Sequence, residues 1–227
     1  MKNNNQITVV IPAYNEEKTI AGVIKSVKPY CNRVLVVISK KSSDRTSQIV
    51  KRMKIEYIVD NGVGKGEGLR CAIDAVKHGI IVFFDADGSH IAADIPLVVK
   101  PILQNKADLV IASRFLGGSE EFHGDLNKFL RISFGMIISL IVNWRFKSMI
   151  MDTQNGFRAI RANVVKSLRL NSNHTEIETE MCIKCLKKNY RILEVPSREL
   201  KRKFGESNIV LLRDGWRYAW VTFRNLF

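Results

Sequence analysis

The stretch VFFDADGSH occupies residues 82–90 and changes character abruptly in its middle. Three apolar residues are followed by two aspartates, Asp85 and Asp87, with only Ala86 between them. Two carboxylates this close repel each other, and burying one of them without a partner is costly. The sequence therefore predicts a positive group or a bound cation at the end of a buried strand.

Strand-like and helix-like segments alternate through the first half of the chain. Apolar runs that predict strands lie at 7–13, 33–39, 55–61, 80–87 and 107–114, and segments with helical spacing separate them. This alternation predicts an α/β fold, with a mostly parallel central sheet flanked by helices. Ligands of such sheets bind beyond the carboxyl ends of the strands, where the two aspartates are expected.

Longer helices dominate the second half. The sequence predicts an amphipathic helix at 126–146, a short strand and a helix within 151–168, a helix at 176–189, a strand at 190–197, a basic loop at 202–208 and a terminal helix at 214–227. No apolar stretch approaches the roughly 20 residues that a spanning helix needs. MKNNNQ runs straight into a strand, so we expect no signal peptide and a cytoplasmic protein.

The net charge of +14 is concentrated in the second half of the chain. Residues 1–96 hold 14 basic and 10 acidic residues, or +4, and residues 97–227 hold 22 and 12, or +10. This excess predicts an anionic partner such as a phosphorylated substrate, an acidic membrane surface or nucleic acid. No aromatic-rich nucleic-acid motif accompanies it. Cys182 and Cys185 form a lone CxxC in a predicted helix, which favours reduced thiols over a metal site.

The DxD pattern at the end of a strand suits one divalent cation. Mg²⁺ and Mn²⁺ prefer oxygen ligands and often take a few carboxylates together with substrate phosphates. Such an ion would neutralise Asp85 and Asp87 and then hold a diphosphate.

Six motifs occur in an order that points to one family. They are IPAYNEEKTI (11–20), GKG (64–66), DAD (85–87), ASRF (112–115), NGFRAIR (155–161) and RKFGESN (202–208). Together they resemble the family 2 glycosyltransferases of the GT-A fold, and within them the polyprenyl-phosphate sugar synthases such as dolichyl-phosphate mannose synthases. The resemblance extends to about residue 208. It implies a glycosyltransferase domain over 1–208, with a nucleotide-sugar half (1–115) and an acceptor half (116–208), followed by an amphipathic helix (209–227).

The resemblance also implies roles for individual residues. The nucleotide pocket would contain Pro12, Tyr14, Asn15, Glu16, Ser39, Lys65, Asp85, Ala86 and Asp87. The metal would be held by Asp85 and Asp87, with Ser89 as a third ligand. The phosphates of donor or acceptor would contact Arg114, Arg131 and Arg202, with Ser207 completing the loop and Lys128 as a rival to Arg131. Asp87 and the three arginines would be the catalytic set. Arginine suits these sites because its planar fork matches phosphate oxygens.

One departure from the family pattern concerns the nucleobase. Many members carry an acidic pair after the second strand, whereas Ser39 and Lys40 stand there in SKKSSDRT (39–46). In the family this region contacts the base or the sugar of the nucleotide, so the base preference stays open. Lys40 could meet a phosphate, although we favour a solvent-facing side chain.

The acceptor class follows from the bases that the chain offers. A sugar hydroxyl usually needs a general base to attack, whereas a phosphate is already an anion. Asp152 and Glu180 are the notable candidates for such a base, and we favour structural roles for both. On this reading Asp152→Asn would be silent with a phosphate acceptor and lethal with a saccharide acceptor.

The terminal segment carries aromatic residues at helical spacing. Trp216, Trp220 and Phe223 fall near one face, and Arg217 and Arg224 share the segment. Aromatics with arginines suit the headgroup region of a membrane. A helix that packs these residues into the core is an equal alternative.

The sequence thus predicts metal-dependent, inverting transfer of a hexose, with mannose or glucose favoured. The donor would be GDP- or UDP-linked, the acceptor a polyprenyl or dolichyl phosphate, and the site the membrane surface. The alternatives are a family 2 enzyme with a saccharide acceptor, a nucleotidyltransferase, a basic module without catalysis, and an inactive family member.

Overall fold

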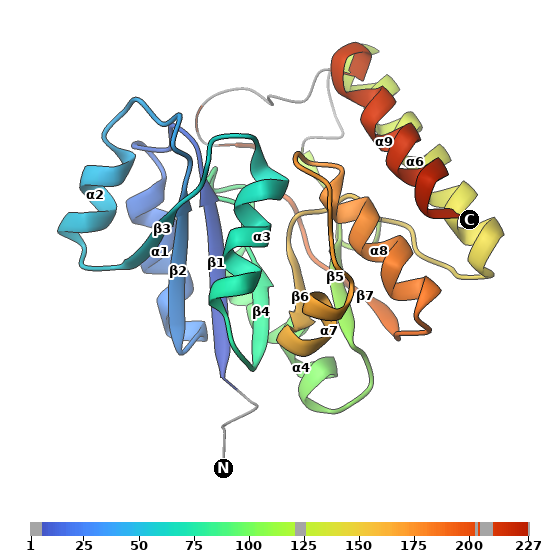
Figure 1. Cartoon of the computed structure of the whole chain (residues 1–227), viewed down its shortest axis with the longest axis horizontal. Helices are drawn as coiled ribbons and strands as arrows, with labels where there is room; N and C mark the ends of the chain where they lie inside the picture. The colour runs from blue at the N-terminus through green and yellow to red at the C-terminus, as the bar shows by residue number, and fades with distance from the viewer. Residues whose placement is uncertain (1–5, 121–125, 203, 205–210, 227) are drawn as a thin grey trace.

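The computed structural model describes residues 6–120, 126–202, 204 and 211–226. Seven strands form one sheet in the order β3-β2-β1-β4-β6-β5-β7 (Figure 1). The strands are β1 (Ile7–Ala13), β2 (Arg33–Ile38), β3 (Glu56–Val59), β4 (Ile80–Phe83), β5 (Leu109–Ser113), β6 (Arg158–Arg161) and β7 (Ile192–Pro196). All pairings are parallel except those of β6, which runs antiparallel to both β4 and β5. The predicted mostly parallel sheet is therefore confirmed.

Helices cover both faces of the sheet. The helices are α1 (Ile20–Val27), α2 (Thr46–Arg52), α3 (Lys65–Ala75), α4 (Ile95–Leu103), α5 (Arg114–Gly117), α6 (Leu126–Phe146), α7 (Ala162–Ser167), α8 (Ile177–Lys187) and α9 (Leu211–Leu226), with 3-10 turns η1 (Lys28–Tyr30) and η2 (Ala92–Asp94). Successive strand residues point to opposite faces. Accordingly Val9 and Ile11 of β1 join the core under α1 and α4, whereas Val10 joins the core under α3, α7 and α8.

The strand β4 is shorter than the sequence indicates. It ends at Phe83, and Asp85 and Asp87 lie in the turn that follows, where Gly88 takes a φ of +77°. The backbone of both aspartates is therefore outside the hydrogen-bond ladder of the sheet, and their carboxylates lie just beyond its carboxyl edge.

The helices α6 and α9 lie side by side at the end of the molecule farthest from β3 (Figure 1). On α9, Tyr218, Val221 and Leu226 are buried, whereas Trp216, Trp220 and Phe223 are exposed. The aromatic face predicted from the sequence thus points outward, and the opposite face packs inward. Within the residues that the structure describes, no helix is both long enough and apolar enough to cross a membrane.

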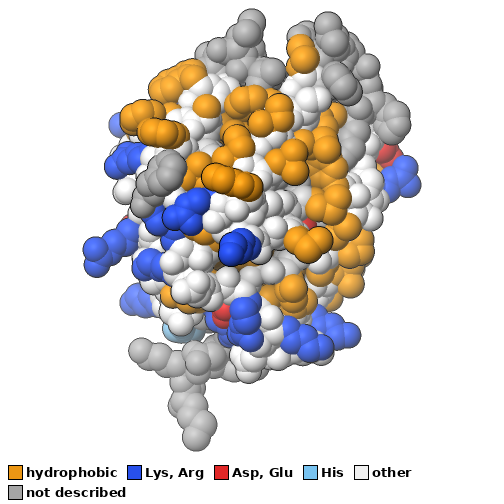
Figure 2. All heavy atoms as spheres, turned by 90° about the vertical axis from the view of Figure 1, so that its right-hand side faces the viewer, with side chains coloured by type: hydrophobic (Ala, Val, Ile, Leu, Met, Phe, Trp, Pro, Cys, Tyr) orange, Lys and Arg blue, Asp and Glu red, His pale blue; other side chains and the backbone are white. Residues whose placement is uncertain are grey.

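Apolar side chains of α6 are exposed beside those of α9. We call the set Leu140, Trp144, Trp216, Trp220 and Phe223 the apolar patch, within which Trp144 is 81% exposed. Figure 2 shows apolar side chains gathered over this face of the molecule, with Lys and Arg side chains around them. An exposed apolar area of this kind typically marks an interaction surface.

Candidate active site

A cavity of about 580 Å³ opens at the carboxyl ends of β1, β2 and β4. Ten of the residues predicted from the sequence line it: Pro12, Tyr14, Glu16, Ser39, Lys65, Asp85, Ala86, Asp87, Arg114 and Arg202. They come from segments that are far apart in the chain but follow neighbouring strands. The side chain of Arg131 and the whole of Ser207 lie outside the described residues.

Two of the predicted residues, Asn15 and Ser89, do not line the cavity but hold neighbouring residues that do. Asn15 takes a φ of +57°, and its Oδ1 accepts a 2.9 Å hydrogen bond from the backbone N–H of Ser43. Asn15 therefore fixes the turn that presents Tyr14 and Glu16. Ser89 donates its backbone N–H (3.0 Å) and its hydroxyl (2.7 Å) to Asp87 Oδ1, which orients that carboxylate.

The positive partner of Asp85 is Lys65. Its ammonium Nζ lies 2.7 Å from Asp85 Oδ1, and His90 Nε2 lies 3.3 Å from Asp85 Oδ2. Burial alone would raise the pKa of Asp85, but the charge of Lys65 and the contacts with Lys65 and His90 together outweigh burial and lower the pKa below its usual range. Asp85 is therefore an anion at neutral pH.

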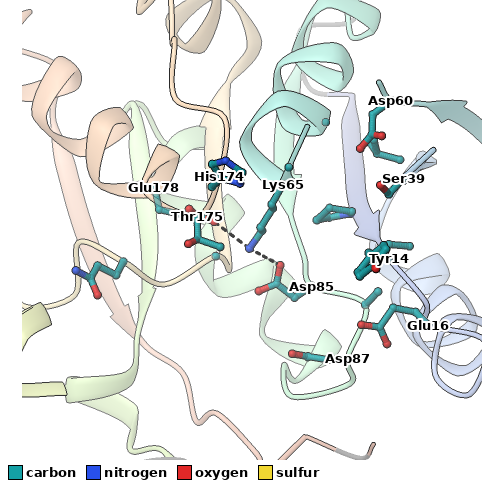
Figure 3. A pocket seen from close by; sticks show the side chains of 18 of the residues that line it. Tyr14, Glu16, Ser39, Asp60, Lys65, Asp85, Asp87, His174, Thr175 and Glu178 are labelled. Atoms are coloured by element: carbon teal, nitrogen blue, oxygen red, sulfur yellow. Dashed lines mark ion pairs between the residues drawn. The ribbon is translucent and has the colours of Figure 1, made fainter. Parts of the chain in front are cut away.

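Lys65 has a second carboxylate partner that the sequence reading missed. Glu178, on α8, places Oε1 2.9 Å from Lys65 Nζ, and Figure 3 shows Lys65 pointing between the two acids. Burial lowers the pKa of Lys65, but Asp85 and Glu178 outweigh it and raise the pKa. Arg158 supports this arrangement because its guanidinium donates to the backbone carbonyl of Glu178 at 2.8 Å.

The glycines around Lys65 explain how α3 and α8 come so close. A Cβ on Gly64 would lie 2.3 Å from His174 Nδ1, and one on Gly66 would lie 2.6 Å from the carbonyl oxygens of Ser172 and His174. The GKG motif thus lets the first turn of α3 press against the loop before α8.

Asp87 faces a different cation. Arg202 Nε lies 3.2 Å from Asp87 Oδ2. Glu16 is close to this pair, and the pKa of Glu16 is raised by burial and by the negative charges of Asp87 and Asp85. The strand-end aspartates therefore meet fixed cations, as the opening stretch predicted, while Glu16 adds negative potential beside them.

Asp85 and Asp87 fit a divalent cation that takes only part of its ligands from the protein. Within the described part of the chain, no group of three or more His, Cys, Asp or Glu side chains forms a complete cage. Mg²⁺ and Mn²⁺ commonly bind through one or two carboxylates and take their remaining ligands from water and substrate phosphates. Asp85 and Asp87 suit that mode.

The candidate general bases are occupied elsewhere. Asp152 is buried and receives Arg114 through Nε–Oδ2 and Nη2–Oδ1 hydrogen bonds of 2.8 Å each. Glu180 accepts from the backbone N–H groups of Asn171 and Ser172 and pairs with Lys184 at 2.6 Å. Both acids therefore hold structure, as favoured from the sequence. Because Asp152 orients Arg114, the expectation that Asp152→Asn is silent does not fit the geometry.

Several cavity residues lie outside the motifs. They are Asp60, Gln154, His174, Thr175, Glu178, Glu199, Arg217 and Tyr218, among others. Asp60 directly follows β3, so the rule that singled out Asp85 also pointed to it. Arg217 and Tyr218 belong to α9, which thus forms part of the cavity wall. Lys40 is exposed and outside this lining, whereas Lys41 belongs to it.

The CxxC cysteines are fully buried in α8, and burial raises the pKa of both thiols. This agrees with the expectation of reduced, packed thiols.

Comparisons with known proteins agree with this architecture. The model of glycosyl transferase family 2 matches residues 8–169, so the chain belongs to that family. The uncharacterized protein MJ1222 of Methanocaldococcus jannaschii is 33% identical over 213 residues, which cover 90% of this chain and 86% of that protein. The UDP-N-acetylglucosamine–dolichyl-phosphate N-acetylglucosaminyltransferase of Methanococcus voltae is 27% identical over 223 residues, covering 87% of each chain.

The fold matches that of a solved structure. Glucosyl-3-phosphoglycerate synthase from Mycobacterium tuberculosis, in complex with Mn²⁺, UDP-glucose and phosphoglyceric acid, superposes with a TM-score of 0.78 at 22% identity. The match covers 99% of this chain and 81% of that one. The predicted GT-A fold is confirmed, and the protein is a glycosyltransferase.

Proposed function

We propose that this glycosyltransferase moves a hexose from a nucleotide sugar to a polyprenyl or dolichyl phosphate, with inversion at the anomeric carbon. The observation that carries the proposal is the meeting of Asp87 with Arg202, at 3.2 Å, in a cavity that Arg114 also lines. The cavity would thus hold the donor diphosphate at Asp87 and the acceptor phosphate at Arg114 and Arg202. The Methanococcus voltae relative is named for a dolichyl-phosphate acceptor, which supports this choice.

The reaction needs little proton transfer. An oxygen of the acceptor phosphate attacks the anomeric carbon, the bond to the diphosphate oxygen breaks, and the nucleoside diphosphate leaves. Since the attacking phosphate is already an anion, no general base is required, and this agrees with the engagement of Asp152 by Arg114. Arg114 and Arg202 would hold the acceptor phosphate against its repulsion from the donor.

Asp85 and Asp87 would hold Mg²⁺ or Mn²⁺. Such an ion, when bound, supplies positive charge that stabilises the departing diphosphate. Lys65 keeps Asp85 ionised and in place, and Ser89 orients Asp87.

A donor screen tests the proposal. The protein is incubated with Mn²⁺, a short polyprenyl phosphate and several GDP- and UDP-linked sugars, and the nucleoside diphosphate released is measured. We expect release from one donor that depends on the acceptor, and at least a 100-fold loss in Asp87→Ala, on the order of removing one key electrostatic group. Release that ignores the lipid phosphate, or full activity in Asp87→Ala, would contradict the proposal.

We further propose that the apolar patch rests on the cytoplasmic membrane surface, where the acceptor resides. Aromatic residues flanked by arginines suit the headgroup layer, and Trp216 and Trp220 are 62% and 57% exposed on the helix that also carries Arg217. Flotation with vesicles of phosphatidylglycerol and phosphatidylcholine tests this. Trp220→Ser should reduce binding severalfold, whereas Tyr57→Ser, an exposed aromatic on β3, should not. Equal flotation of both variants would argue against the patch as the membrane contact.

A further inference from the structure

The carboxylate of Asp60 lies in the cavity at the end opposite Glu178 and His174 (Figure 3). It follows β3 directly and is only 6% exposed. Its Oδ1 accepts two backbone hydrogen bonds, from Lys40 at 2.9 Å and from Gly62 at 2.7 Å. One oxygen of a buried carboxylate is therefore fixed by the backbone.

The other oxygen, Oδ2, has no hydrogen-bond partner among the residues that the structure describes. It lies beside α3 at Gly68, where a Cβ would come within 2.9 Å of it. A glycine at this position keeps the approach to Oδ2 open. Because Asp60 lines the cavity, Oδ2 can accept a hydrogen bond from a bound ligand. A ligand that covered Oδ2 without offering a donor would leave a buried acceptor unpaired, which costs free energy.

The surroundings of Asp60 suit a flat ring. Val37, Val63 and Gly62 line this end of the cavity, and Tyr14 is exposed beside it. Lys65 and Asp85 lie farther along (Figure 3). Lys65 is a cation, and Asp85 would meet a diphosphate through the metal ion that it is proposed to hold. A nucleotide with its diphosphate at the strand-end aspartates would place its base at the Asp60 end.

Ser39 offers a hydrogen-bond donor to a ligand beside the acceptor of Asp60. Its side chain lies beside Asp60 in the cavity, and its Oγ accepts the backbone N–H of Lys41 at 3.4 Å. The hydroxyl proton of Ser39 is therefore available to a carbonyl oxygen of the ligand, while a carboxylate such as that of Asp60 offers acceptor oxygens.

We propose, on the basis of the proposed function, that Asp60 and Ser39 read the nucleobase of the donor and select an imide edge, in which a ring N–H stands beside a carbonyl. Uracil presents this edge at N3–H and O4, and guanine at N1–H and O6. Cytosine and adenine present an acceptor nitrogen at the same place, which would face the Asp60 carboxylate without a proton between them. Asp60, which follows β3, would thus take the role of the acidic residue that many family members carry at the position of Ser39 and Lys40 after β2.

The backbone contacts dictate what Asp60→Asn does. Since two N–H groups hold Oδ1, the amide oxygen of Asn must take that position and its NH₂ must replace Oδ2. The group that meets the base changes from acceptor to donor, with almost no change in shape. An imide N–H then faces a second donor, and the acceptor nitrogen of cytosine finds a partner.

Titration calorimetry with UDP, GDP, CDP and ADP in the presence of Mn²⁺ tests the proposal. The wild type should bind UDP or GDP about 10- to 100-fold more tightly than CDP and ADP, as expected when a buried acceptor is left unpaired. Whichever of UDP and GDP binds more tightly identifies the base of the donor as uracil or guanine. Asp60→Asn should lose this preference and gain affinity for CDP, and Ser39→Ala should weaken the preferred ligand severalfold. Asp74→Asn, the same change at an exposed position of α3, serves as the control.

The outcomes separate this inference from the proposed function. Equal binding of the four diphosphates, or an unchanged ranking in Asp60→Asn, would overturn the base-reading assignment and leave sugar transfer standing. Binding of none of the four would contradict both.

Discussion

Replacing Lys65 by Met removes the cation that joins α3, the DxD turn and α8. Lys65 Nζ lies 2.7 Å from Asp85 and 2.9 Å from Glu178, whose side chain is 3% exposed. At an effective dielectric constant of about 20, each contact is worth about 6 kcal/mol in Coulomb energy, most of which offsets the desolvation of the ions. Removing one partner of a buried ion pair lowers the free energy of unfolding by about 3–5 kcal/mol, because the other charge stays buried without a partner. We expect the free energy of unfolding of Lys65→Met to fall by that amount.

Urea unfolding followed by circular dichroism at pH 7 measures the loss. The double variant Lys65→Met/Glu178→Gln should recover about 2 kcal/mol, because the acid on α8 no longer lacks its partner. Arg198→Met breaks an exposed pair with Glu120 and should cost less than about 1 kcal/mol. The reasoning would be refuted if Lys65→Met lost no more free energy of unfolding than Arg198→Met, or if the double variant were no more stable than Lys65→Met. The ion pairs of Lys65 with Asp85 and Glu178 would then not hold α3 and α8 together.

Three further substitutions test the frame of the site and the packing of the helices. Asp152→Asn should cost about 3 kcal/mol at pH 7. Although burial raises the pKa of Asp152, the charge of Arg114 lowers it below its usual range. This stabilisation is therefore present above the unfolded pKa of about 4 and lost as pH falls through the lower folded value. Urea unfolding at pH 7 and pH 3 checks it, and a difference that grows in acid would refute the pairing. Gly66→Ala should destabilise by about 1–3 kcal/mol because its Cβ meets the carbonyls of loop 172–174. Gly22→Ala in α1, with no atom within 4 Å, should stabilise by up to about 1 kcal/mol in thermal melts.

The parallel strands were predictable because their signal is local. Runs such as ITVVIPA bury both faces of a strand, and β1 indeed sends Val9 and Val10 into opposite cores. The position of β6 was not predictable in the same way. Its residues Arg158–Arg161 show that a short strand forms, but its place between β4 and β5, and its antiparallel direction, depend on long-range packing.

The site was predictable where its residues follow strands. Asp85, Asp87, Ser39 and Arg114 each come directly or nearly directly after a strand, and they meet at one edge. Glu178 escaped prediction because it lies on a helix, and its distance to Lys65 depends on glycines that let α3 approach the loop before α8. No local pattern in the chain encodes that distance.

Asp60 is a different case. The rule about strand ends applied to it, but the comparison with the family pattern directed attention to Ser39 and Lys40, one strand earlier. Backbone hydrogen bonds from Lys40 and Gly62 then tie the two strand ends together. The base-reading role proposed for Asp60 thus places the carboxylate one strand away from the position that the family pattern indicates.

The antiparallel strand β6 also has a consequence for synthesis of the protein. The four residues of β4 are all buried, yet their partner on one side, β6, ends at residue 161, which is 161 − 83 = 78 residues after β4 ends. At about 5–20 residues per second, a ribosome needs roughly 4–16 s to add them. Throughout that interval the nascent polypeptide carries an apolar strand with an open edge, the feature that most readily pairs with another chain. A chaperone that shields the emerging N-terminal half should therefore raise the yield of folded enzyme.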